Sequence, residues 1–216
     1  MTAQRGHRPR LQPKVAVVDS GINAEHSHVG NVAGGVSFVS DDYKDFIGHG
    51  TAVAAAICSH EPRVELYAVK IFDRSFATQI ESVVKALEWC ADNGMDVVNV
   101  SLATAKNEHA RLLEQPSRRV NILTAPLEFM GLPAYPGSFE WCFGVTSDPG
   151  CPRDEYRSSP AGRFLASPLP REIPGVEVTH NFSGSSFAVA NFTGLICRLI
   201  YDRDSRTNLV LRSLLS

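Results

Sequence analysis

Three short segments of the chain carry an acid, a base and a hydroxyl group. Asp19 ends the apolar run in VVDSGI, His49 lies in GHGTAVA, and Ser186 lies in GSSFAVA. An aspartate can orient a histidine, and that histidine can remove the proton of a serine hydroxyl, which becomes a nucleophile. The three residue types indicate nucleophilic catalysis, provided that folding brings the segments together.

Each segment alone also has a structural explanation. An Asp after a strand often serves in a turn, and a serine such as Ser185 or Ser186 often caps a helix by accepting a free amide hydrogen. The combination favours a site, because the carboxyl ends of parallel strands and the adjoining helix N-termini meet at one edge of an α/β sheet. Glycines at 48, 50 and 184 would leave room there for a substrate carbonyl.

The elements that must position these residues alternate between strand and helix patterns. Apolar, β-branched runs predict strands at residues 14–19, 64–72, 95–102, 120–125 and 143–147. Helical spacing or small apolar residues predict helices at residues 48–57, 78–91 and 187–200, the second with a capping box of Thr78 and Glu81. Residues 128–183 are rich in proline and are expected to be mostly loop. This alternation predicts an α/β fold with a mainly parallel sheet.

Length and composition predict one globular domain, residues 14–216, after a basic tail at residues 1–13. The net charge of −2 comes from 21 basic and 23 acidic residues spread along the chain, so we expect no nucleic-acid partner. No apolar stretch approaches the ~18 residues of a membrane span. The N-terminus also lacks the long apolar segment of a signal peptide, so we expect a cytoplasmic protein without a membrane partner.

The cysteines and the other histidines give weaker signals. The five cysteines are odd in number and form no CxxC pair, so we expect reduced, mostly buried thiols rather than disulfides or a zinc site. His26 and His28 form an HSH pair, but no acidic or thiol ligand stands at a suitable spacing. We therefore expect neither a metal nor another cofactor.

Taken together, the motifs resemble those of the subtilisin-like serine proteases, the subtilase family, in the chain order Asp, His, Ser. The connecting segments LYAVKIF, ALEWCADNGMDVVNVSLA and YPGSFEWCFGVTS are also similar to that family, so the resemblance covers residues 15–201. It implies a three-layer subtilisin-like fold in which helices flank a mainly parallel central sheet. It also implies an enzyme that hydrolyses peptide bonds.

The resemblance implies a role for each motif residue. Ser186 would attack the scissile carbonyl, His49 would act as general base and then acid, and Asp19 would hold the imidazole tautomer. His49 would then lie within hydrogen-bond reach of both Asp19 and the Ser186 hydroxyl, with looser contacts allowed when no substrate is bound. Ser185 replaces the usual threonine, and together with the backbone amide of Ser186 it would help to stabilise the oxyanion.

A further match concerns substrate binding. Ser101, Leu102 and Ala103 correspond to the family's Ser-Leu-Gly, a segment that pairs with an extended peptide or protein substrate through backbone hydrogen bonds. The methyl group of Ala103 should narrow or reshape the pocket for the residue before the cut. Residues 73–76 are expected to form the opposite wall. His180, close to the serines, is either a substrate contact or a solvated loop residue.

The chain also departs from the family pattern. The family's oxyanion Asn is missing from ILTAPLEFMG, where Pro126 is nearest by alignment, and CSHEPRVE replaces the usual calcium-binding insertion. Two hypotheses therefore stay open. The first is an intracellular serine endopeptidase, such as a dedicated enzyme that removes leader segments. The second is a weak or inactive relative that binds extended peptides, and in either case a partner chain could complete the shortened fold.

Overall fold

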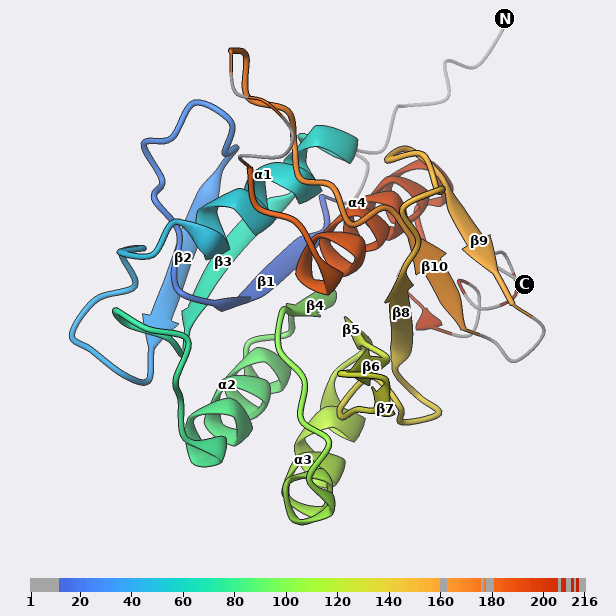
Figure 1. Cartoon of the computed structure of the whole chain (residues 1–216). Helices are drawn as coiled ribbons and strands as arrows, with labels where there is room; N and C mark the ends of the chain where they lie inside the picture. The colour runs from blue at the N-terminus through green and yellow to red at the C-terminus, as the bar shows by residue number, and fades with distance from the viewer. Residues whose placement is uncertain are drawn as a thin grey trace, which may run out of the picture.

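The computed structural model describes residues 12–159, 163–175, 177, 181–205, 207–208, 211 and 213, and in this part an eight-stranded sheet forms the centre of the fold (Figure 1). The sheet comprises β1 (Lys14–Asp19), β2 (Val32–Ser37), β3 (Glu65–Lys70), β4 (Val97–Val100), β5 (Ile122–Pro126), β8 (Phe143–Ser147), β9 (Tyr156–Ser158) and β10 (Phe164–Ala166). The strand order is β2-β3-β1-β4-β5-β8-β10-β9. Neighbouring strands are parallel except β9 and β10.

Helices cover both faces of this sheet, as Figure 1 shows. They are α1 (His49–His60), α2 (Ile80–Asp92), α3 (Asn107–Arg119) and α4 (Ser185–Arg203). Side chains alternate across a strand, so Val15 and Val17 of β1 pack in one cluster with α1 and α4, whereas Ala16 and Val18 pack in another with α2 and α3. Because β1 is buried on both faces, it is apolar throughout. This arrangement confirms the predicted three-layer α/β fold with a mainly parallel sheet.

The predicted strands are all present, although several are shorter than expected. The capping box was wrong: α2 begins at Ile80 after Gln79, and no side-chain cap is formed. β2 was not predicted, because the two glycines in VAGGVS weaken a strand pattern. α3 was also missed, since it is mostly polar and contains Pro116.

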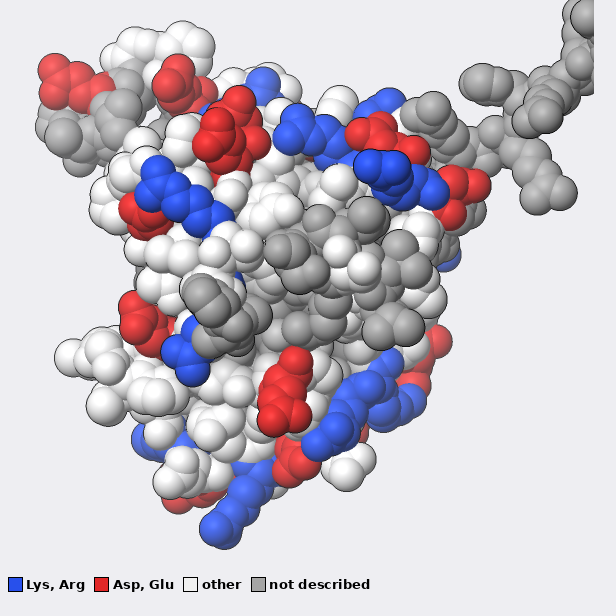
Figure 2. Space-filling view, turned by 90° about the vertical axis from the view of Figure 1, so that its right-hand side faces the viewer, with Lys and Arg blue, Asp and Glu red and all other residues white. Residues whose placement is uncertain are grey.

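The loop-rich region after β5 contains a small hairpin, β6 (Glu128–Phe129) and β7 (Leu132–Pro133). All five cysteines are free and buried, as expected. Figure 2 shows acidic and basic side chains interspersed on the face that it presents, with no uniformly basic area there. Within the described residues, no helix combines the length and apolarity that a membrane crossing requires.

Candidate active site

Asp19 lies at the carboxyl end of β1 and is fully buried. His49 is the first residue of α1, and its Nδ1 atom lies 2.9 Å from each carboxylate oxygen of Asp19. The backbone amide of Ser20 also donates to this carboxylate, at 2.7 Å. A carboxylate only accepts hydrogen bonds, so the proton of neutral His49 resides on Nδ1 and leaves Nε2 free to accept another.

A second carboxylate, Asp45, fixes the start of α1, and the sequence analysis did not identify it. It accepts hydrogen bonds from the amides of Ile47, Gly48 and Thr51, from the Thr51 hydroxyl, and from the Ser20 hydroxyl, all at 2.6–3.0 Å. A polar side chain just before a helix start is the signal that could have revealed it. Asp45 thus ties the first turn of α1 to the residue after Asp19.

Gly50 allows α1 to approach β1 closely. Its amide donates to the Ser20 hydroxyl at 2.9 Å. A Cβ atom here would lie 2.2 Å from the carbonyl oxygen of Gly21 and 3.2 Å from the Cβ of Asp19. The absence of a side chain at Gly50 therefore permits the contact between His49 and Asp19.

Replacing Gly50 with alanine is expected to lower the free energy of unfolding by about 1–3 kcal/mol, because the new methyl group overpacks the junction of α1 and β1. Urea unfolding of both proteins measures the change. Gly34→Ala is the matched control, since a Cβ there would meet nothing closer than 3.8 Å. Equal shifts of the two unfolding midpoints would contradict the packing argument.

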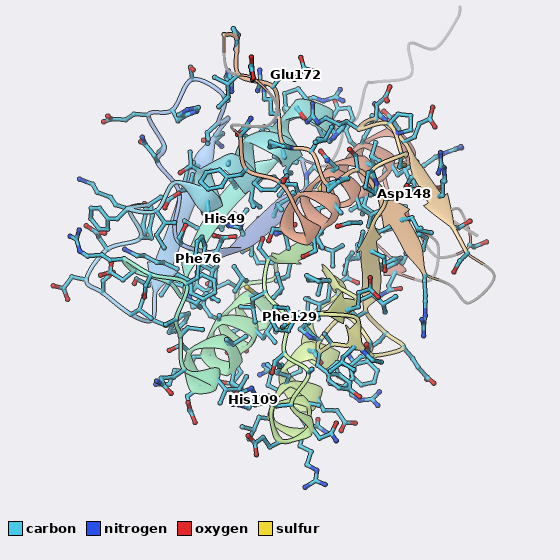
Figure 3. The ribbon with its side chains drawn as sticks, in the orientation of Figure 1. His49, Phe76, His109, Phe129, Asp148 and Glu172 are labelled. Carbon is cyan, nitrogen blue, oxygen red and sulfur yellow. The ribbon has the colours of Figure 1, made fainter. Side chains whose placement is uncertain are left out.

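The environment of His49 raises its pKa. Burial of the ring by itself lowers that pKa, but the hydrogen bond that His49 donates to Asp19 and the negative charges of Asp19 and Asp45 outweigh burial. The ring lies in an aromatic setting, with centroids of Phe76 at 5.2 Å, Phe187 at 5.5 Å and Phe182 at 5.8 Å. Figure 3 shows His49 and Phe76 next to each other at this edge of the sheet.

Ser186 lies in the first turn of α4 and is half-buried. Its hydroxyl donates to the carbonyl of Ser101 at 3.3 Å, and among the described residues it makes no hydrogen bond to His49. The expected contact of His49 with Asp19 is thus present, whereas the reach of His49 to Ser186 stays a prediction, because the Ser186 hydroxyl is hydrogen-bonded to Ser101. Rotation about the Cα–Cβ bond of Ser186 can release its hydroxyl from this carbonyl.

The two serines do not cap α4 with their side chains. The N-cap is Gly184, whose φ of 135° suits glycine, and no side-chain cap bond is formed. In the part of the chain that the structure describes, the amides of Ser185 and Ser186 make no hydrogen bond. These free amides at a helix N-terminus can stabilise a negative charge.

A second donor for that charge is not supplied by the amides of residues 126 and 127. Pro126 has no amide hydrogen. The amide of Leu127 donates to the carbonyl of Val145 at 2.9 Å. In the segment where the family carries its oxyanion Asn, the Leu127 amide is therefore already used in a hydrogen bond to the sheet.

The segment after β4 offers a free backbone edge. The Ser101 hydroxyl accepts a hydrogen bond from Asn99 at 2.9 Å, and Thr104 pairs with Tyr135 through two backbone bonds of 3.0 and 2.9 Å. Between them, the backbone groups of Leu102 and Ala103 have no hydrogen-bond partner among the described residues. They are available to pair with an extended peptide.

A pocket of about 280 Å³ adjoins this edge, and we call it the apolar pocket. Its lining includes Phe72, Phe76, Ile80, Val83, Leu102 and Ala103. Phe76 therefore forms part of the expected opposite wall. Asp73 does not line the pocket, because its carboxylate pairs with the buried Lys70 ammonium at 2.8 Å.

The sequence contains three other candidate histidines, His26, His28 and His180. His26 and His28 contact each other edge to face, with ring centroids 5.3 Å apart. Among the described residues, no group of three or more potential ligands is suited to a metal ion. His180 lies outside the described residues.

The sequence of this chain is similar to those of known proteases. The model of the subtilase family matches residues 11–125. An alkaline protease of Alkalihalobacillus alcalophilus is 32% identical over 200 residues, which cover 84% of this chain and 50% of the relative. Subtilisin Savinase of Lederbergia lenta is 32% identical over 200 residues, covering 84% of this chain and 71% of the relative. The chain thus spans about half the length of several relatives that it matches.

Solved structures show a similar fold. A cold-adapted subtilisin-like serine proteinase superposes with a TM-score of 0.75 at 20% identity, covering 100% of this chain and 86% of the other. A lanthipeptide protease has a TM-score of 0.73 at 17% identity, covering 94% and 78%. The prenylagaramide maturation protease PagA has a TM-score of 0.70 at 22% identity, covering 94% and 82%.

Proposed function

Because this chain belongs to the subtilase family of serine proteases, we propose that it is a serine endopeptidase that uses Asp19, His49 and Ser186. The observation that carries the proposal is the hydrogen-bonded pair of Asp19 and His49 at the start of α1, with Ser186 and free amides at the start of α4. An acid, a base, a nucleophile and an oxyanion donor are the parts that acyl transfer needs.

The proposed reaction has two stages. The Ser186 hydroxyl gives its proton to Nε2 of His49 as Oγ bonds to the scissile carbonyl carbon, and Asp19 stabilises the resulting imidazolium. The carbonyl oxygen becomes an oxyanion beside the amides of Ser185 and Ser186. His49 then protonates the leaving amine, and the C–N bond breaks to leave an acyl-enzyme. Water, deprotonated by His49, hydrolyses that ester and restores Ser186.

The substrate would bind as an extended strand. The free backbone groups of Leu102 and Ala103 can form hydrogen bonds to a peptide, as in other cases of strand addition. The apolar pocket would then receive side chains from the part of the substrate that precedes the cut. Neither nucleic acid nor a membrane enters this proposal.

We further propose that the enzyme processes peptide precursors inside the cell, for example by removing a leader segment. Two of the structural neighbours are named as a lanthipeptide protease and a prenylagaramide maturation protease, and their likeness to this chain is one of fold. Five free, buried cysteines are compatible with a reducing compartment. The second candidate function, a module that only binds extended peptides, is favoured by the missing oxyanion Asn.

Labelling with a fluorophosphonate probe tests the peptidase proposal, because the probe reacts only with an activated serine. We expect one labelled residue, Ser186, identified by mass spectrometry after digestion. Hydrolysis of peptides together with labelling of Ser186 supports the enzyme. Peptide binding without labelling or hydrolysis would support the binding module.

The missing Asn also predicts a slow enzyme. Loss of one side-chain donor from an oxyanion hole lowers kcat by roughly 10²–10³. Asn placed at Pro126 or at Glu128 is expected to raise kcat at least tenfold in one of the two variants. Leu127→Asn is the matched control, because the side chain at this position packs against Gly144. The Cδ1 atom of Leu127 lies 2.7 Å from where a Cβ on Gly144 would be. A fast wild type that gains nothing would show that another donor fills the hole.

A further inference from the structure

A second cavity, distinct from the apolar pocket, also lies near His49. It has a volume of about 280 Å³, and its lining includes the first turns of α1 together with Pro170, Arg171, Ile173, Asn181 and Phe182 from the loop before α4. The His49 ring contacts an aromatic side chain of each pocket: Phe76 of the apolar pocket at 5.2 Å and Phe182 of the second cavity at 5.8 Å. A peptide that extends from the apolar pocket past His49 would bring the residues that follow the cut toward this cavity.

The second cavity is lined by three basic side chains, His26, His28 and Arg171, and we call it the basic pocket. Arg171 is half-buried, and one guanidinium nitrogen donates to the backbone carbonyl of His28 at 3.1 Å. Among the described residues, no carboxylate forms an ion pair with Arg171. A guanidinium has five N–H donors in a planar fork, so several remain for a planar anion.

The two histidines add hydrogen-bond donors. Nδ1 of His26 accepts the backbone amide of His28 at 3.2 Å, so the proton of the neutral ring is on Nε2. Burial, with the positive charge of Arg171 and then that of His26, lowers the pKa of His28. An anion bound beside these rings would relieve this repulsion between the basic groups.

One acidic residue, Asp45, also lines the basic pocket. Its carboxylate already accepts hydrogen bonds from three backbone amides and two hydroxyl groups. Those donors stabilise its negative charge and hold it at the start of α1. Since no ion pair of Arg171 forms among the described residues either, its guanidinium can pair with a group from outside the chain.

We propose that the basic pocket binds a carboxylate of the substrate segment that follows the cleaved bond. This carboxylate belongs either to an Asp or Glu side chain or to the C-terminus of a short leaving peptide. Phe182 lines the pocket, and Arg171 supplies the charge-assisted hydrogen bonds. The inference rests on the proposed peptidase function, because that function places the cut beside His49.

The test uses a peptide that the wild-type protein cleaves, with Glu or Gln at each of the first three positions after the cut. The same peptide is also made with a C-terminal acid or amide. At one position we expect kcat/KM to be about tenfold higher for the carboxylate, the gain of a charge-assisted hydrogen bond at a half-exposed site. A difference within a Glu/Gln pair shows that the pocket binds a side-chain carboxylate. A difference within the acid/amide pair shows that it binds the C-terminal carboxylate. Equal kcat/KM values within every pair of peptides would overturn the proposal, and this result needs only the wild-type protein.

Variants then assign the preference to Arg171. We expect Arg171→Gln to reduce the carboxylate preference to about one and Arg171→Lys to restore part of it, since lysine keeps the charge but not the planar fork. Arg198→Gln, at an exposed position of α4, is the matched control and should keep the full preference. An unchanged preference in Arg171→Gln would overturn the assignment.

Binding separates this proposal from the proposed function. The same peptides, now with a fluorescent label, are bound to the Ser186→Ala variant, and fluorescence anisotropy measures their affinity. This measurement does not depend on peptide hydrolysis. If the wild type neither hydrolyses peptides nor reacts with the probe, the peptidase proposal fails, yet tighter binding of the carboxylate peptides would still support the basic pocket. Equal affinities within all pairs would contradict the pocket alone.

Discussion

Ser186→Ala is expected to lower kcat for peptide hydrolysis by about 10⁶ and to abolish fluorophosphonate labelling, because the nucleophile of the proposed triad is lost. The fold should survive, since the hydroxyl of Ser186 makes one hydrogen bond, to the Ser101 carbonyl, and its removal leaves α4 capped by Gly184. Single-turnover hydrolysis and labelling by mass spectrometry measure the two effects. Circular dichroism checks that the variant is folded.

The matched control for this change is Ser183→Ala, which removes an exposed hydroxyl three residues away. Its labelling and turnover should stay within a few-fold of the wild type. Hydrolysis that is unaffected by Ser186→Ala would come from another site or from a contaminant. In that case the chain would be better described as a peptide-binding module.

Much of the sheet could be predicted from the sequence because a buried parallel strand has a strong pattern. KVAVVD is apolar on both faces and coincides with β1, and the start of α1 at His49 followed from a run of small residues. α3 could not be predicted in this way. It buries Leu113, Pro116 and Ser117 but is mostly polar, so tertiary packing outweighs its local composition.

The candidate site shows the same division. Residue types and chain order were enough to predict that Asp19 and His49 lie close together. Asp19 lies where a strand ends, and His49 lies where a helix begins. The hydrogen bond of Ser186 to the Ser101 carbonyl was not predictable, because the orientation of a hydroxyl depends on acceptors from distant segments. Nor could sequence alone show that Asp73 pairs with Lys70 rather than lining the apolar pocket. Ion pairing of a buried ammonium decided its position.

Asp19→Asn is expected to lower kcat by roughly 10⁴, the loss typical of a serine-protease triad without its aspartate. The amide of Asn can donate to Nδ1 of His49, which then holds its proton on Nε2. A protonated Nε2 cannot accept the hydroxyl hydrogen of Ser186. The side-chain volume hardly changes, so the loss reports the tautomer and the charge rather than packing.

The same variant should shift the pH profile in a defined direction. His49 must be neutral to act as a base, so kcat/KM rises with pH through the pKa of His49. Asp19 raises that pKa in the wild type, and without its charge burial of the ring prevails and lowers the pKa. The acidic limb of the profile should therefore move to lower pH in Asp19→Asn.

The control for this shift is Asp96→Asn, which changes a buried carboxylate that accepts the backbone amide of Lys14 at the opposite end of β1. Asp96→Asn should leave the acidic limb in place even if it lowers stability, because it does not contact His49. Measurement of kcat/KM between pH 5 and 9 for the three proteins distinguishes the roles of the two carboxylates. If Asp19→Asn kept the wild-type limb and lost less than tenfold in kcat, Asp19 would be a structural residue, and the base would have to be held in its tautomer by another group.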